Sequence, residues 1–154
     1  MSTAKIYYDH RDIRKPYGIL TNGCFDLIHV GHLRLLQKVA ERKTHGQYLI
    51  VAVNDNDSVE KLKGTGRPVN SIMDRMEILA GIEGVDFVTP FSGGNVAQVI
   101  RDLRPCEWIK GAPYTLETLN PEEVEAAKSV GAKIIILEKF GDYSTTGILE
   151  RMNR

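Results

Sequence analysis

Short apolar runs alternate with segments of helical periodicity along the chain. The residues from Tyr48 to Val53 form a continuous apolar run, as expected of a strand that is buried on both faces of a parallel sheet. Further on, Ile72, Met76 and Leu79 recur at helical spacing and predict one buried helix face. The predicted strands are 18–21, 48–53, 85–88, 107–109 and 133–137, and the predicted helices are 33–43, 71–82, 95–103, 120–130 and 145–152.

The order of these elements predicts the fold class. Strands that alternate with helices indicate an α/β fold with a parallel sheet and right-handed connections. We expect a single domain over residues 17–154, in which a five-stranded sheet carries helices on both faces. Residues 1–16 show no clear periodicity, and we expect them to form an N-terminal arm packed on that domain.

Composition and charge narrow the class of ligand. The chain has 154 residues, of which 42% are hydrophobic and 26% charged, as is usual for a soluble globular domain. Its 20 basic and 20 acidic residues cancel, which argues against a nucleic-acid or membrane-surface partner, because both usually require a basic excess. A chain of zero net charge can still form a basic pocket for a small anionic ligand.

Cysteine spacing and hydropathy argue against further classes of protein. Cys24 and Cys106 follow no CxxC pattern, so the sequence indicates neither a disulfide framework nor a zinc site. No apolar run is long enough to cross a bilayer, and the first residues lack the pattern of a signal peptide. We therefore expect a cytoplasmic protein.

Candidate chemistry begins directly after the first predicted strand, in the segment TNGCFDLIHVGH at residues 21–32. Ligands of parallel sheets bind beyond the carboxyl ends of the strands, and a helix N-terminus there attracts phosphate. His29 and His32 bracket Gly31, which lets the backbone approach a ligand closely. Two imidazoles at this turn could donate hydrogen bonds to phosphate oxygens and stabilise developing negative charge. The alternative is one core histidine and one helix cap.

A basic segment runs from Lys61 to Arg75, after the second predicted strand and into the start of the second predicted helix. Its charged residues are Lys61, Lys63, Arg67, Arg75 and the single acid Asp74. Gly64 and Gly66 would make the loop mobile, as a lid over phosphates requires. The alternative is a solvated charged loop. At the entrance of the last predicted helix, Ser144, Thr145 and Thr146 offer more hydroxyls than a structural cap needs, which favours phosphate binding.

Three segments carry a resemblance to a known family. The HxGH motif at 29–32 resembles the signature of cytidylyltransferase-like nucleotidyltransferases, and an STT segment stands at 144–146 as in that family. The segment LKGTGRPV at 62–69 is similar to a loop of bacterial heptose-1-phosphate adenylyltransferases. A looser match is KGAPY at 110–114, where Pro113 replaces the aspartate of KGxDY. Lys139 stands where related glycerol-3-phosphate cytidylyltransferases have arginine.

This resemblance implies a Rossmann-like nucleotidyltransferase domain over residues 17–154, with Mg²⁺ accompanying the nucleoside triphosphate. The implied catalytic residues are His29, His32, Lys63 and Arg75. The implied nucleotide-binding residues are Thr21, Asn22, Gly23, Cys24, Phe25, His29, Gly31, His32, Arg67, Lys110, Gly111, Tyr114, Ser144, Thr145 and Thr146. The implied acceptor-binding residues are Asp26, Lys63 and Arg75.

The leading hypothesis is transfer of adenylyl from ATP to heptose 1-phosphate, giving ADP-heptose for surface polysaccharide. The runner-up is transfer of cytidylyl from CTP to glycerol 3-phosphate, and a hypothesis of another class is a nucleotide-binding module without catalysis. Bifunctional relatives also carry a sugar kinase, and the length of 154 residues leads us to expect a transferase without one. Family relatives are commonly dimers, so we expect a homodimer.

Overall fold

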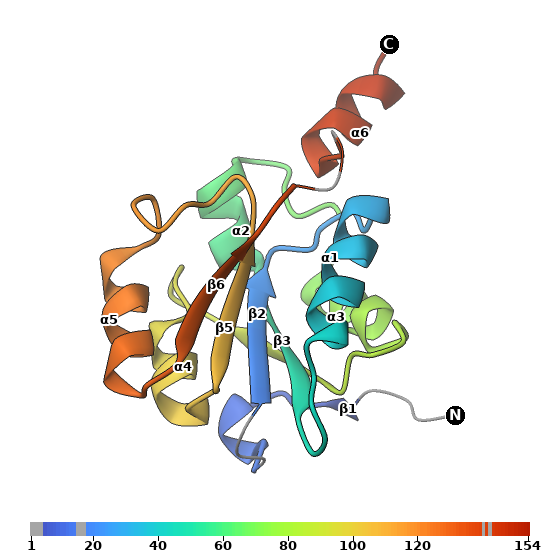
Figure 1. The fold of residues 1–154 in the computed structure, drawn as a ribbon. Helices are drawn as coiled ribbons and strands as arrows, with labels where there is room; N and C mark the ends of the chain where they lie inside the picture. Colours follow the sequence, from blue (N-terminus) through green and yellow to red (C-terminus); the bar gives the residue numbers. More distant parts are fainter. Residues whose placement is uncertain (1–4, 15–17, 140, 142) are drawn as a thin grey trace.

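A computed structural model describes residues 5–14, 18–139, 141 and 143–154, and it shows one parallel sheet with the strand order β1-β4-β3-β2-β5-β6 (Figure 1). The strands are β1 (Lys5–Ile6), β2 (Gly18–Gly23), β3 (Tyr48–Asn54), β4 (Phe87–Phe91), β5 (Glu107–Gly111) and β6 (Lys133–Leu137). The helices are α1 (Val30–Glu41), α2 (Asn56–Lys63), α3 (Ile72–Ala80), α4 (Ala97–Leu103), α5 (Pro121–Ser129) and α6 (Thr145–Met152), with a short 3-10 helix η1 (His10–Asp12).

The five predicted strands are all present as β2 to β6, and the α/β class is confirmed. The sheet has one strand more than expected, because β1 pairs with β4 at the edge and brings part of the N-terminal segment into the sheet. Ile13, which follows η1, is buried in the core. A strand of two residues leaves no alternation for a sequence pattern to detect, which explains the difference.

Helix α2 was also not predicted, since the basic segment was expected to follow β3 as a loop. Asp55 starts this helix by accepting a hydrogen bond on its side chain from Ser58 N at 2.9 Å. The helix places Lys63 in its last turn and ends at Gly64, whose φ of +99° is costly for other residues. Only residues 64–70 of the basic segment form the loop.

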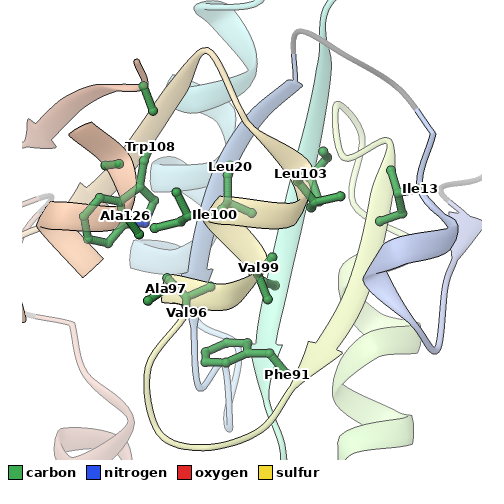
Figure 2. Close-up of a cluster of buried hydrophobic side chains, with 14 of the residues drawn as sticks. Ile13, Leu20, Phe91, Val96, Ala97, Val99, Ile100, Leu103, Trp108 and Ala126 are labelled. Atoms are coloured by element: carbon green, nitrogen blue, oxygen red, sulfur yellow. The ribbon is translucent and has the colours of Figure 1, made fainter. Parts of the chain in front are cut away.

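Two apolar layers sandwich the sheet. On one side, Leu36 and Val39 of α1 and Leu79 of α3 pack against residues such as Ile19 and Val51. On the other side, Ile100 of α4 and Ala126 of α5 pack against Leu20 and Trp108, as Figure 2 shows. Because neighbouring strand residues such as Ile19 and Leu20 point to opposite faces, each strand contributes to both layers.

The strand order places a topological switch point between β2 and β5. From β2 the chain runs outward through β3 and β4, and it then returns to the other side of β2 to form β5 and β6. Connections therefore leave β2 and β5 in opposite directions, which opens a crevice beyond their carboxyl ends. Helix α6 extends beyond this edge of the sheet and contains no buried residue (Figure 1). Within the described part of the chain, no helix is both long and apolar enough to span a membrane.

Candidate nucleotide-binding cleft

A cleft of about 810 Å³ lies at the switch point. It gathers the segment after β2, the last turn of α2 with the basic loop, the segment after β5 and the start of α6. The predicted site residues that line it are Asn22, Gly23, Cys24, Phe25, Asp26, His29, Gly31, His32, Lys63, Arg67, Lys110, Gly111, Tyr114, Ser144, Thr145 and Thr146. Thr21 and Arg75, also predicted, do not line it.

The two histidines form the N-terminal cap of α1. His29 is the capping residue, and its Nδ1 accepts from Gly31 N at 3.1 Å, while Nδ1 of His32 accepts from His29 N at 3.3 Å. The rings stack, with centroids 3.8 Å apart and planes 28° apart. Because both Nδ1 atoms accept hydrogen bonds, a neutral ring carries its proton on Nε2. The backbone thus fixes the tautomer that can donate to a ligand in the cleft.

Glycine is required between the two histidines. A Cβ on Gly31 would lie 2.8 Å from Cε1 of His29 and 3.2 Å from Cβ of Tyr143. Any side chain would displace the imidazole that caps the helix. The motif HxGH is therefore explained by packing as well as by ligand approach.

The surroundings of the histidines keep both rings neutral at neutral pH. Burial, with a smaller contribution from neighbouring His29, lowers the pKa of His32 to about 4. Burial also lowers the pKa of His29 below its usual value. The two alternatives weighed from the sequence are thus compatible, because the residues cap a helix through Nδ1 and remain available to a ligand through Nε2.

Asp26 makes contacts that the sequence did not predict. Its side chain is 1% exposed, and its carboxylate accepts hydrogen bonds from Arg67 Nε at 2.7 Å and from the amides of Val69 and Asn70, each at 2.9 Å. Burial alone would raise the pKa of Asp26, but the two amides and the guanidinium outweigh it and lower that pKa. The carboxylate therefore holds the basic loop, a contact that the expected acceptor-binding role did not include.

Arg75 is also placed differently from its prediction. Its guanidinium is completely buried and donates to backbone carbonyls of Cys24 and Asn54, each at 2.7 Å, and of Asn70 at 2.9 Å. It donates as well to Asn56 Oδ1 at 3.0 Å. Sequence reasoning counted it among cations facing phosphate, whereas here it ties together the ends of β2 and β3 and the basic loop.

Thr21 is likewise structural, since its buried hydroxyl donates to Ile109 O at 2.8 Å between β2 and β5. Its neighbour Asn22 does reach the cleft and accepts on Oδ1 from Trp108 Nε1 at 2.9 Å. Trp108 is fully buried, which gives it a packing role. Burial raises the pKa of the Cys24 thiol, which favours a packing role over that of a nucleophile.

Lys110 and Tyr114 form the wall of the cleft beyond β5. The ammonium of Lys110 lies 4.4 Å from the centre of the Tyr114 ring and donates to Asn22 O at 3.1 Å. Burial lowers the pKa of Lys110, while the nearby carboxylate of Glu123 opposes that effect. This wall therefore offers a cation and an aromatic ring to a ligand.

The three hydroxyl residues before and within α6 differ in their contacts. Ser144 caps α6 by accepting from Gly147 N at 2.9 Å, and Thr145 Oγ1 donates to Leu27 O at 3.2 Å. Thr146 is exposed in the cleft wall. The hydroxyl of Ser144 therefore caps the helix, and the hydroxyl of Thr145 joins α6 to the segment after β2.

Several polar residues of the cleft were not predicted, among them Asn54, Asn120 and Glu123. Asn54 ends β3, so the rule that ligands lie beyond the carboxyl ends of strands could have found it. Asn120 stands at the start of the predicted helix 120–130, and its Oδ1 accepts from the amides of Glu122 and Glu123. Glu123 Oε2 accepts a hydrogen bond from Val96 N at 2.8 Å, and no sequence pattern predicts this contact.

Together, the parallel sheet, its switch point and the helix terminus at that point define an α/β domain of Rossmann-like architecture. Over residues 20–151 the chain matches the cytidylyltransferase-like family, and it belongs to that family. It is 46% identical over 135 residues to the bifunctional protein HldE of Shewanella piezotolerans and 42% identical over 134 residues to that of Alkalilimnicola ehrlichii.

Each of these alignments covers 87% of this chain but 27% of the relative, so the chain spans about a quarter of the length of the curated relatives it matches. Among solved structures, the lipopolysaccharide core biosynthesis protein from Thermoplasma volcanium is similar with a TM-score of 0.65 and 18% identity. That similarity covers 80% of this chain and 98% of the other, and it confirms the fold.

Proposed function

We propose that this domain is a nucleotidyltransferase that joins ATP to heptose 1-phosphate, giving ADP-heptose and pyrophosphate for surface polysaccharide synthesis. The observation that carries this proposal is the pair of Nε2 donors of His29 and His32 at the N-terminus of α1, in the same cleft as Lys63 and Arg67. The similarity to HldE proteins and the LKGTGRPV segment support ATP and the heptose acceptor.

In this reaction an oxygen of the acceptor phosphate attacks the α-phosphorus of ATP. The bond from that phosphorus to the oxygen bridging to the β-phosphorus breaks, and its electron pair leaves with pyrophosphate. Neither step needs a covalent intermediate on the protein, so the site has to align two anions and balance their charge. The Nε2–H groups of His29 and His32 would donate to oxygens of the α- and β-phosphates, and Lys63 and Arg67 would hold the β- and γ-phosphates.

The nucleoside end of ATP would lie against the wall formed by Lys110, Gly111 and Tyr114. Thr146 and the other hydroxyls at the start of α6 would complete the phosphate site, since Ser144 and Thr145 line the same cleft. We propose that Lys63 also serves the acceptor phosphate, because it is an exposed cation that lines the cleft.

A magnesium ion fits this site as a companion of the triphosphate. Among the described residues, no group of three or more His, Cys, Asp or Glu side chains is placed to hold a metal ion. The buried carboxylate of Asp26 is already used by Arg67 and two amides. Mg²⁺ retains water and binds well to substrate phosphates, so the triphosphate itself would carry the ion and its charge-neutralising chemistry.

We further propose that the protein acts in the cytoplasm as a homodimer on small-molecule substrates alone. The net charge of zero supports the absence of a nucleic-acid or membrane partner. The dimer rests on the family resemblance. Equilibrium sedimentation of the purified chain tests it, and a monomer at micromolar concentration would contradict it.

Pyrophosphate release tests the reaction directly. ATP and CTP are each combined with heptose 1-phosphate and with glycerol 3-phosphate, with Mg²⁺ present throughout. We expect release with ATP and heptose 1-phosphate. Release with CTP and glycerol 3-phosphate alone would replace our choice by the runner-up, and nucleotide binding without turnover in any combination would favour a non-catalytic module.

A further inference from the structure

The ion pair between Asp26 and Arg67 leaves most of the guanidinium unused. The carboxylate of Asp26 accepts a hydrogen bond from Nε of Arg67 at 2.7 Å. The terminal atoms Nη1 and Nη2 of Arg67 have no hydrogen-bond partner among the described residues. The exposed pair of Asp9 and Arg11 is different, because Nε and Nη2 of that arginine both bind the carboxylate. The Asp26 pair is therefore arranged to keep the guanidinium fork available.

Asp26 is a rigid partner for this contact. Its Oδ2 also accepts from Val69 N and its Oδ1 from Asn70 N, each at 2.9 Å, and its own carbonyl accepts from Asn70 Nδ2 at 3.0 Å. Four hydrogen bonds thus join Asp26 to residues 67–70 of the basic loop. A carboxylate held in this way cannot turn with the guanidinium, so it sets the direction of the Arg67 side chain.

The direction matters because Arg67 lines the cleft. Its side chain is 12% exposed, and the same cleft contains His29, His32 and Lys63. A guanidinium presents its donors in a fixed plane, and two neighbouring nitrogens match two oxygens of a phosphate group. An arginine held by Nε alone keeps all four Nη hydrogens for a ligand, whereas one held by Nε and one Nη keeps three.

We propose that Asp26 is a positioning residue that holds Arg67 by Nε so that Nη1 and Nη2 bind two oxygens of a polyphosphate in the cleft. The inference rests on the proposed function in so far as the polyphosphate would be the triphosphate substrate or the pyrophosphate product. The partner chemistry is a chain of linked phosphates and not a single phosphate, since Lys63, Arg67 and the histidine pair line one continuous cleft.

Inorganic tripolyphosphate tests this, because it carries neither base nor sugar. Its affinity and that of orthophosphate are measured by calorimetry for the wild-type chain, Asp26→Asn, Arg67→Ala and the double variant. We expect each single variant to weaken tripolyphosphate binding about tenfold or more, because charged hydrogen bonds are lost, and orthophosphate binding much less. The double variant should bind no more weakly than Arg67→Ala. Asp9→Asn is the matched control and should bind as the wild type does.

Two outcomes would overturn the proposal. One is an Asp26→Asn effect that persists in the Arg67→Ala background, which would give Asp26 a role independent of the guanidinium. The other comes from Arg67→Lys, which keeps the charge without the paired nitrogens and so tests the geometry even if Asp26→Asn does not fold. Wild-type affinity in Arg67→Lys would show that charge alone suffices. Tripolyphosphate binding without pyrophosphate release would instead contradict the proposed reaction and leave this inference standing.

Discussion

The imidazole rings of His29 and His32 stack with their centroids 3.8 Å apart, although both belong to a single helix cap. Two protonated rings at this distance would repel each other, and each Nδ1 would lose the amide hydrogen bond that it accepts. The pair is stable only as two neutral rings. Toward an anion, this pair could therefore act by hydrogen-bond donation and not by ion pairing.

Removing one ring of this pair should lower turnover without unfolding the protein. In His32→Ala we expect kcat to fall about a hundredfold or more, as for the loss of one oxyanion donor, with the circular dichroism spectrum retained. Pyrophosphate release measures the effect. His45→Ala is the control, because His45 is exposed and lies outside the cleft. Pyrophosphate release at the wild-type rate in His32→Ala would contradict the assignment.

Stability should depend on pH through His32. The pKa of His32 is lowered to about 4 in the folded state, from an ordinary 6.5, so between these values the unfolded chain binds more protons. The free energy of unfolding therefore falls as pH decreases from 6.5 toward 4, by up to about 1.4 kcal/mol per pH unit from this group. Urea titrations at pH 7 and pH 5.5 measure how much the free energy of unfolding changes with pH.

In this comparison His32→Gln is the reference, because glutamine keeps an acceptor but does not titrate. The slope between pH 7 and pH 5.5 should be smaller in His32→Gln than in the wild type. If the wild type and His32→Gln had equal slopes, a group other than His32 would cause the pH dependence. Proton NMR of the wild type should show His32 still neutral at pH 5.5.

Lys63 and Lys61 offer a matched comparison on one helix. Both are exposed in the last turn of α2, but Lys63 lines the cleft and Lys61 does not. In Lys63→Ala we expect KM for the nucleoside triphosphate to rise about tenfold, because a charged hydrogen bond to phosphate is lost. Lys61→Ala should leave KM unchanged. Equal effects of the two variants would mean that the helix attracts the nucleotide by net charge alone.

Arg75 should matter to stability more than to ligand binding. Arg75→Met removes the buried donor to the carbonyls of Cys24, Asn54 and Asn70 and leaves those acceptors unsatisfied. We expect the free energy of unfolding to drop by about 3 kcal/mol. Urea denaturation measures the drop, with the exposed Arg151→Met as control. Unchanged stability combined with a large rise in KM would restore Arg75 to the phosphate site.

Sequence patterns predicted the sheet because each main strand is apolar on both faces. The run from Tyr48 to Val53 and the helical spacing of Ile72, Met76 and Leu79 are local signals, and the structure places elements at both. The HxGH turn was recognisable because its chemistry is local as well. The sequence patterns did not predict the two-residue strand β1 or the helix α2.

The roles of Asp26 and Arg75 could not be predicted for a different reason. Charge alone cannot distinguish a cation that faces solvent from one that is buried among carbonyls, and that difference is set by contacts between distant segments. Arg75 meets Cys24 across 51 positions of sequence, and Arg67 meets Asp26 across 41. Such contacts depend on the packed fold and leave no periodicity in the chain.

One wall of the cleft is built on an element with little stability of its own. Ser144, Thr145 and Thr146 stand at the start of α6, an eight-residue helix without a buried residue. Helices of this length are marginal in water unless they are packed against other elements. Backbone amides of α6 therefore open by local fluctuation long before the sheet does, and hydrogen exchange there reports on occupancy of the cleft. A ligand that bound the hydroxyls would slow that exchange, so the exchange rate of α6 would measure how much of the cleft is occupied.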